Sequence, residues 1–203
     1  TSNNVIVVTG FGPFGPHKVN DSWECVKRLK ALNLEDELGI TLVIQKIPVL
    51  YSASVKEVPF LWENHKPALM IHVGVHNTGN IVIERVARKM GYNKPDVSGL
   101  YPETCCCPIG TEECISTGLD LKSIISSVDS RGITISESTN AGNFLCEYTY
   151  YVSLCQDPKK TLFIHIPPAG TGPAVEDKTF ALRNIIIAVY KQLMNEKLVN
   201  SRF

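Results

Sequence analysis

The stretch VIVVTGFGPFG, residues 5–15, is an apolar, β-branched run that stops at a glycine-rich turn. An apolar run of this length, ended by such a turn, is typical of a strand buried on both faces. Similar short apolar runs recur along the chain at residues 41–47, 68–73, 81–83, 133–136 and 161–166. Strands that are apolar throughout, when they alternate with helices, predict a mostly parallel sheet covered on both sides.

Helical spacing fills most of the intervals between these runs. The expected helices are 22–32, a stretch around 55–62 that Pro59 should bend or interrupt, 121–128 with Asp120 as its cap, 142–154 and 177–197. The long segment 91–117 shows no clean period and is expected to be irregular. The sequence therefore predicts an α/β fold in which residues 1–203 form a single-domain three-layer α/β/α sandwich with a mostly parallel central sheet. In such sheets ligands bind beyond the carboxyl ends of the strands.

Composition and charge exclude several functional classes. The 203 residues are 44% hydrophobic and 20% charged, with 20 basic and 20 acidic side chains, which is a globular profile. A surface without net charge has no electrostatic reason to bind nucleic acid or a membrane, and the apolar runs are too short to span a bilayer. Seven irregularly spaced cysteines and no visible secretory signal indicate reduced thiols and a cytoplasmic location. A monomer is the favoured oligomeric state.

The glycine-rich turn also matches the G-x-G-x-x-G pattern of dinucleotide-binding sites. Pro13 has no N–H group to offer a pyrophosphate, and Gln45 stands where an acidic residue would be expected. Two aromatic residues of the turn, Phe11 and Phe14, instead stand at the mouth of the sheet and suit the faces of a small, flat, uncharged group. The turn therefore predicts an aromatic pocket rather than a nucleotide site.

Cys146 is the candidate nucleophile, because it lies near the start of the helix expected at 142–154. Free N–H groups and a partial positive charge at a helix start favour a thiolate and can receive an oxyanion. The alternative is a small packing residue. His165, at the downstream end of the last strand, is the candidate base, with His72 as its main competitor. Glu84 closes a short apolar run and would orient the imidazole, unless it is an ordinary solvated glutamate.

Several motifs together carry a resemblance to a known family. The stretches GFGPFG with VNDSW, IVIERVA, NAGNFLCEYTYY and FIHIPPAG resemble the motifs of type I pyroglutamyl peptidases, in order from about Val5 to Ile187. The resemblance implies an α/β/α sandwich and a cysteine peptidase that removes N-terminal pyroglutamyl residues from peptides through a thioester, without a metal or organic cofactor. The residues that match the family's catalytic positions are Glu84, Cys146 and His165. The implied pyroglutamate pocket consists of Phe11, Phe14 and Asn20, with Phe144 and Leu145 beside the nucleophile.

Two features resemble animal-type members more than bacterial ones. Lys94 occupies about the position of a bacterial arginine near the active site, and the loop after Glu84 contains the cysteines Cys105, Cys106, Cys107 and Cys114. Three consecutive cysteines cannot all face one metal ion, so a zinc site is not expected.

Two alternatives stay open from the sequence. One is a non-catalytic paralogue that binds pyroglutamyl ends, against which the intact set Glu84, Cys146 and His165 argues. The other is an unrelated α/β enzyme of nucleosidase type in which Cys146 is structural.

Overall fold

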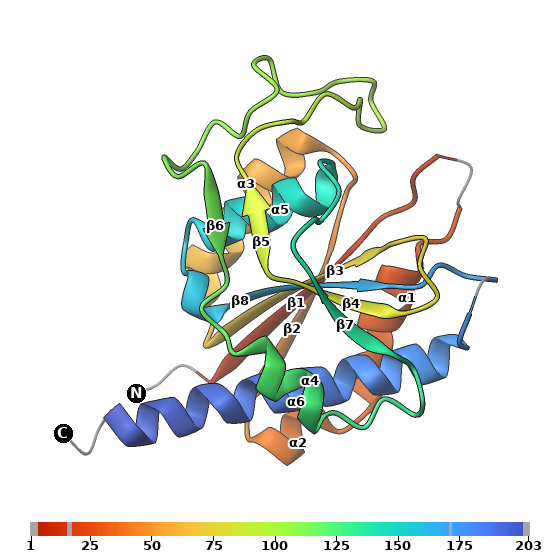
Figure 1. Cartoon of the computed structure of the whole chain (residues 1–203), viewed down its shortest axis with the longest axis vertical. Coiled ribbons are helices and arrows are strands. Elements are labelled where there is room, and N and C mark those ends of the chain that lie inside the picture. Colours follow the sequence, from red (N-terminus) through yellow and green to blue (C-terminus); the bar gives the residue numbers. More distant parts are fainter. Residues whose placement is uncertain (1–3, 16–17, 171, 201–203) are drawn as a thin grey trace.

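A central sheet organises the computed structural model, which describes residues 4–15, 18–170 and 172–200. The described residues form a six-stranded sheet in the order β2-β1-β3-β8-β4-β7, lying between helices (Figure 1). The strands are β1 (Val5–Phe11), β2 (Thr41–Ile47), β3 (Leu69–Val75), β4 (Ile81–Glu84), β7 (Ile135–Ser138) and β8 (Thr161–Ile166). A separate two-stranded ribbon pairs β5 (Val86–Arg88) with β6 (Cys114–Ser116).

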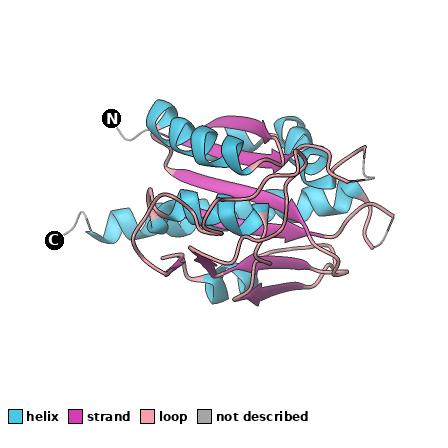
Figure 2. Cartoon of the chain, turned by 90° about the horizontal axis from the view of Figure 1, so that it is seen from above, coloured by secondary structure: helices cyan, strands magenta, loops and turns pink. Residues whose placement is uncertain are grey.

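The helices cover both faces of the sheet, as the views in Figures 1 and 2 show. They are α1 (Asp21–Arg28), α2 (Leu34–Leu38), α3 (Tyr51–His65), α4 (Leu121–Ser127), α5 (Leu145–Leu154) and α6 (Val175–Asn200). Helices α3 and α5 pack together on one face, whereas α1, α2 and α4 each contact the long helix α6 on the other. In the part of the chain that the structure describes, no helix has the length and apolar character needed to cross a membrane. The predicted α/β/α arrangement is confirmed.

Strand direction differs across the sheet. Strands β1, β2, β3 and β8 are mutually parallel, as predicted, but β4 pairs with β8 in the antiparallel sense and with β7 in parallel. The last two strands of the sheet therefore run against the other four. As a result the carboxyl end of β4 lies beside the middle of β8, rather than at the common edge where the parallel strands end.

The two faces of β3 and β8 carry different residues because side chains alternate along a strand. Ile71 and Val73 of β3 and Ile164 of β8 belong to the large aliphatic core under α1, α4 and α6. The opposite face carries Phe163, which belongs to a second, aromatic core under α3 and α5. Burying each of these side chains contributes about 1.5–3 kcal/mol, so both faces are specified and the strand register is fixed.

Three of the helices, α3, α4 and α5, can be compared in detail with the predictions from the sequence. Asp120 caps α4 as expected, because its carboxylate accepts a hydrogen bond from the backbone N–H of Ser123. Of the two outcomes expected at Pro59, a bend or an interruption, the interruption does not occur: α3 runs through this residue, with the nearby Val58 and Leu61 buried. The helix expected at 142–154 begins only at Leu145, since the preceding turn contains two residues with positive φ.

Candidate active site

The antiparallel pairing of β4 with β8 brings Glu84 to His165. His165 lies opposite Gly74 of β3 and Val82 of β4, and Glu84 lies opposite Phe163, two residues before His165. Residues two apart on a strand share a face, so Glu84, His165 and Gly74 all face α5. The imidazole Nδ1 of His165 is 2.8 Å from the carboxylate Oε1 of Glu84.

This pair is buried, with 2% of each side chain exposed. Glu84 is therefore not a solvated glutamate. Its second carboxylate oxygen, Oε2, has no hydrogen-bond partner among the described residues. Burial works to lower the pKa of His165, but the charge and hydrogen bond of Cys146 and the Glu84 carboxylate outweigh burial and raise that pKa to about 9. At neutral pH His165 is an imidazolium between two acidic groups.

Cys146 is the second residue of α5, partly exposed, and its thiol is the other neighbour of His165. The cap residue Phe144 has no side-chain hydrogen bond to the first turn, so its side chain leaves the N–H groups there free for a ligand oxygen. Sγ of Cys146 lies over the bare backbone of Gly74, where a Cβ atom would be only 2.7 Å from the sulfur. A glycine in β3 thus makes room for the thiol beside the imidazole.

The other two histidines near this edge have different surroundings. His72 lies in the middle of β3, is fully buried, and its Nδ1 is 2.7 Å from the hydroxyl of Thr9. Burial lowers the pKa of His72 to about 3, so it is a neutral core residue and not the base. His76, just beyond β3, is exposed with its ring centre 5.2 Å from that of His165. Partial desolvation and repulsion by His165 lower the pKa of His76, while Glu84 opposes this effect.

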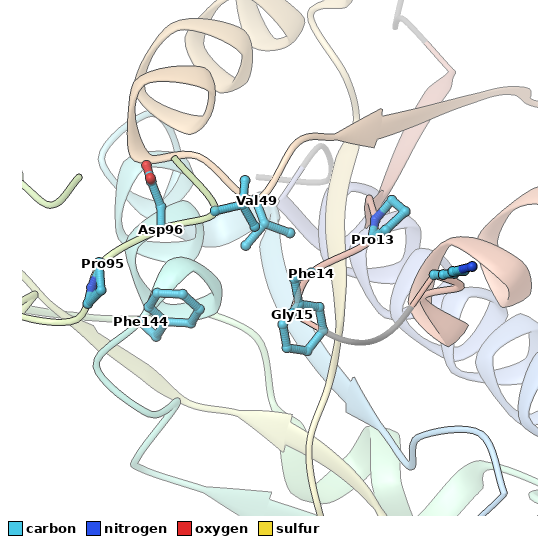
Figure 3. Close-up of a pocket in the computed structure, with 9 residues that line it drawn as sticks. Pro13, Phe14, Gly15, Val49, Pro95, Asp96 and Phe144 are labelled. Carbon is cyan, nitrogen blue, oxygen red and sulfur yellow. The ribbon is translucent and has the colours of Figure 1, made fainter. Parts of the chain in front are cut away.

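A pocket of about 610 Å³ opens beside the start of α5 (Figure 3). Phe14 and Phe144 line it, and in this view their rings lie on either side of the opening. Phe144 is supported from behind by Tyr51, whose ring meets it edge-on with centres 6.0 Å apart. The full lining is Pro13, Phe14, Gly15, Lys18, Val49, Pro95, Asp96, Val97 and Phe144. The two aromatic rings give the pocket an apolar side that suits an uncharged ring, whereas Lys18 and Asp96 add charged groups to the same lining.

The remaining three residues predicted for the pocket are not part of its lining. Phe11 and Leu145 are 3% and 1% exposed and belong to the aromatic core. Asn20 is the cap of α1: its Oδ1 accepts from the N–H and the hydroxyl of Ser22, and its Nδ2 donates to the carbonyl of Gly12. These bonds commit the amide to its own chain, so the structure favours a bracing role for Asn20 over the predicted contact with substrate.

The loop after β5 supplies lining residues that sequence reasoning missed. Asp96 accepts hydrogen bonds from the backbone N–H groups of Tyr51, Ser98 and Leu100, which fastens the loop to the start of α3. Burial works to raise the pKa of Asp96, but these bonds outweigh it and lower the pKa. The only signal in the sequence was an Asp followed two residues later by Ser, a common turn pattern. Lys94 is exposed, and its backbone carbonyl accepts from the Tyr51 hydroxyl.

Among the described residues, no three or more His, Cys, Asp or Glu side chains are grouped so that they could hold a metal ion. The seven cysteines, all within the described ranges, are free thiols. The arrangement over the sheet is a thiol, an imidazolium and a carboxylate in series, next to a pocket with two aromatic rings in its lining. Such a set can transfer an acyl group through a thioester.

Known proteins are similar to this chain in sequence and in fold. A family model described as pyroglutamyl peptidase matches residues 4–182. Pyroglutamyl-peptidase 1 of Homo sapiens is 38% identical over 184 residues, covering 89% of this chain and 87% of the human protein. Pyrrolidone-carboxylate peptidase of Pseudomonas fluorescens is 30% identical over 169 residues, covering 80% and 78%. The crystal structure of Bacillus amyloliquefaciens pyroglutamyl peptidase I aligns with a TM-score of 0.81 at 28% identity, over 94% of this chain and 98% of that one.

Proposed function

The chain belongs to the pyroglutamyl peptidase family, and from that membership we propose that it removes N-terminal pyroglutamyl residues from peptides with Cys146, His165 and Glu84 as its catalytic set. The observation that carries the assignment of residues is the buried hydrogen bond between His165 and Glu84, 2.8 Å long, beside a thiol at the start of α5. The three side chains already lie next to one another, so the reaction requires no rearrangement of the strands and the helix that carry them.

In the proposed reaction the thiol proton of Cys146 resides on the His165 imidazole, and the resulting thiolate attacks the carbonyl carbon of the pyroglutamyl residue. The carbonyl oxygen becomes an oxyanion, and the N–H groups in the first turn of α5 are placed to receive it. The imidazolium of His165 then gives its proton to the departing amine of the next residue, leaving a thioester on the sulfur. The neutral imidazole takes a proton from water, which attacks the thioester and releases pyroglutamic acid.

Glu84 has two tasks in this scheme. Its bond to Nδ1 directs Nε2 of His165 towards the sulfur, because the two ring nitrogens point in opposite directions. Its charge also stabilises the imidazolium, which is needed to protonate the amine. With one carboxylate oxygen lacking a partner among the described residues, the imidazolium is the group that offsets the cost of burying this charge.

The substrate's lactam ring would occupy the pocket between Phe14 and Phe144. A pyroglutamyl group is flat and carries no ammonium, so it can lie between the two aromatic rings, where an ordinary charged N-terminus would lose its hydration. Peptides blocked by pyroglutamate are therefore the proposed partners.

The decisive test compares wild type and Cys146→Ala on a pyroglutamyl anilide, together with iodoacetamide labelling of both. We expect turnover and labelling of Cys146 in the wild type, and neither turnover nor labelling at residue 146 in the variant. The matched control is Cys114→Ala, which removes an exposed thiol outside the site. Single replacement of the remaining cysteines should also cause only modest loss; these are Cys25, Cys105, Cys106, Cys107 and Cys155. A Cys146→Ala enzyme that still turned over would remove the nucleophile assignment.

The same measurements address both alternatives. A non-catalytic binding paralogue would bind pyroglutamyl ends without turnover in the wild type. An enzyme of nucleosidase type would neither hydrolyse the anilide nor depend on the thiol.

A further inference from the structure

Glu147 follows the proposed nucleophile directly and is completely buried, yet the mechanism above gives it no task. Its carboxylate accepts four hydrogen bonds. Oε1 receives the backbone N–H of Arg88 at 3.0 Å and its Nε at 2.8 Å. Oε2 receives Nη2 of Arg88 at 3.2 Å and the backbone N–H of Asn143 at 2.7 Å. One carboxylate thus joins the β5 ribbon to the turn that precedes α5.

The guanidinium of Arg88 holds the other end of the same turn. Its Nη2 donates to Oδ1 of Asn140 at 2.7 Å, and that oxygen also accepts the backbone N–H of Gly142 at 3.2 Å. Both ends of the segment 140–143 are therefore fixed to a single arginine–carboxylate pair. Bidentate pairs of this kind define direction as well as distance.

The turn has a backbone conformation that needs such support. Gly142 has φ of 104° and Asn143 has φ of 51°, and both precede the extended cap residue Phe144. A non-glycine residue in the left-handed region costs about 1 kcal/mol and persists only where its surroundings hold it. The side chain of Phe144 makes no hydrogen bond to the first turn of α5. The orientation of the N–H groups in that turn therefore depends on the conformation of the turn before the helix.

We propose that Glu147 and Arg88 are positioning residues that hold the turn at 140–144 so that the N–H groups at the start of α5 face the carbonyl oxygen under attack by Cys146. This inference rests on the proposed function. Oxyanion donors stabilise a transition state only when they are aimed at the developing charge, and removing one donor costs about 10²–10³-fold in kcat. Misplacement by about 1 Å can cost 10²-fold.

The test variant is Glu147→Gln, which keeps the size of the side chain but replaces one accepting oxygen by an NH₂ group. We expect kcat on a pyroglutamyl anilide to fall about 10²-fold while KM changes less than about threefold. Inhibition by 2-pyrrolidone, which has the lactam ring but no scissile bond, should stay unchanged. Alkylation by iodoacetamide develops no oxyanion, so its rate at Cys146 should also stay near the wild-type value.

The matched control is Glu137→Gln, which breaks the surface pair of Arg85 with Glu137 at the other side of the sheet. We expect its kcat to stay within about twofold of wild type. If Glu147→Gln fails to fold, Arg88→Ala replaces it, because that side chain is 38% exposed and can be removed with less damage to packing. Arg88→Lys should recover part of the loss, since a lysine can reach the carboxylate but not also Asn140.

Three results would overturn the inference: an unchanged kcat in Glu147→Gln and Arg88→Ala, a loss confined to KM, or a parallel loss of alkylation rate. The last result would mean that the pair acts on the thiol and not on the oxyanion. Failure of the proposed function looks different, because the wild type itself would then leave the anilide intact.

Discussion

A methyl group on Gly74 would lie 2.7 Å from Sγ of Cys146, which is far inside van der Waals contact. The same methyl group would lie 2.9 Å from Cζ of Phe163, the ring beneath His165. Gly74 also stands directly opposite His165 in the strand register. The bare backbone at this position therefore lets thiol and imidazole meet over the sheet.

Gly74→Ala should damage catalysis more than stability. The added methyl must push the sulfur away from the imidazole, and we expect kcat/KM to fall by about 10²-fold or more. Overpacking should lower the free energy of unfolding by about 1–3 kcal/mol, so the variant should still fold at room temperature. Anilide hydrolysis and urea denaturation measure the two effects.

The control for Gly74→Ala is Gly79→Ala, in the loop after the same strand, where a Cβ atom would meet nothing within 4 Å. We expect that variant to keep nearly full activity. An alanine at position 74 that left kcat/KM unchanged would show that the sulfur does not need this space.

The raised pKa of His165 makes both activity and stability depend on pH. The ordinary value is 6.5 and the value in the site is about 9, so the proton is held more tightly in the folded state. The resulting stabilisation, on the order of 3 kcal/mol, is complete below pH 6.5 and is lost as pH rises through 9. Hydrolysis should fall over the same upper range, because the imidazolium is lost. Activity profiles and unfolding at pH 6, 8 and 10 check this.

Glu84→Gln should move the alkaline fall of activity to lower pH. The amide keeps a hydrogen-bond partner for Nδ1 but removes the negative charge that helps to raise the pKa of His165. At neutral pH we expect a loss of about 10-fold to 10²-fold in kcat/KM, milder than replacement of His165 itself. An alkaline limb identical to that of the wild type would contradict the electrostatic task assigned to Glu84.

His76 offers an independent check on the charge of His165. Partial burial is the larger cause of the lowered pKa of His76 and repulsion by the neighbouring imidazolium the smaller one, so His165→Asn should raise that pKa part of the way towards its ordinary value of 6.5. Histidine ring resonances followed by NMR between pH 4 and 9 would measure the change. His72 should not titrate in most of this range, since burial lowers its pKa to about 3. If the pKa of His76 were the same in His165→Asn as in the wild type, His165 would be uncharged in the wild-type site.

The sequence was sufficient for the layers of the fold because its strands are apolar on both faces and its helices carry start signals such as Asp120. It also predicted the proposed catalytic residues Cys146, His165 and Glu84, which lie at or near the ends of their elements. The direction of β4 could not be predicted, since three apolar residues and a glutamate fit a parallel or an antiparallel neighbour equally well. That direction is what buries Glu84 against His165.

Residues whose task depends on long-range contacts escaped prediction for a similar reason. Gly74 is one glycine among fourteen, and only the packing of α5 on β3 gives it a task. Asp96 and Glu147 each fasten a group that is distant in sequence, the N–H of Tyr51 and the side chain of Arg88 respectively. Asn20 is a different case: its place after the aromatic turn predicts a substrate contact, and in the structure its side chain also caps α1 and donates to Gly12.

The cap contacts of Asn20 determine what Asn20→Ala should do. Loss of the cap should lower the free energy of unfolding by about 1 kcal/mol. The preference for pyroglutamyl over prolyl substrates should stay as in the wild type, because the amide is already occupied by Ser22 and Gly12. Thermal unfolding and parallel assays with the two anilides would measure both quantities. A narrowed preference would return Asn20 to the pocket.

The final prediction concerns how the pocket selects its ring. Proline resembles pyroglutamate in shape, but it lacks the lactam carbonyl and its N-terminal amine is charged at neutral pH. Placing that charge between Phe14 and Phe144 costs several kcal/mol, because Asp96, the acidic residue of the lining, already accepts from the backbone N–H groups of Tyr51 and Ser98. We therefore expect prolyl anilide to fall below pyroglutamyl anilide by about 10³-fold or more in kcat/KM. Phe144→Ala should weaken both substrates, with Phe60→Ala, an exposed ring on α3, as its control. A wild-type enzyme that cleaved the two anilides within tenfold of each other would show that the pocket does not discriminate by charge.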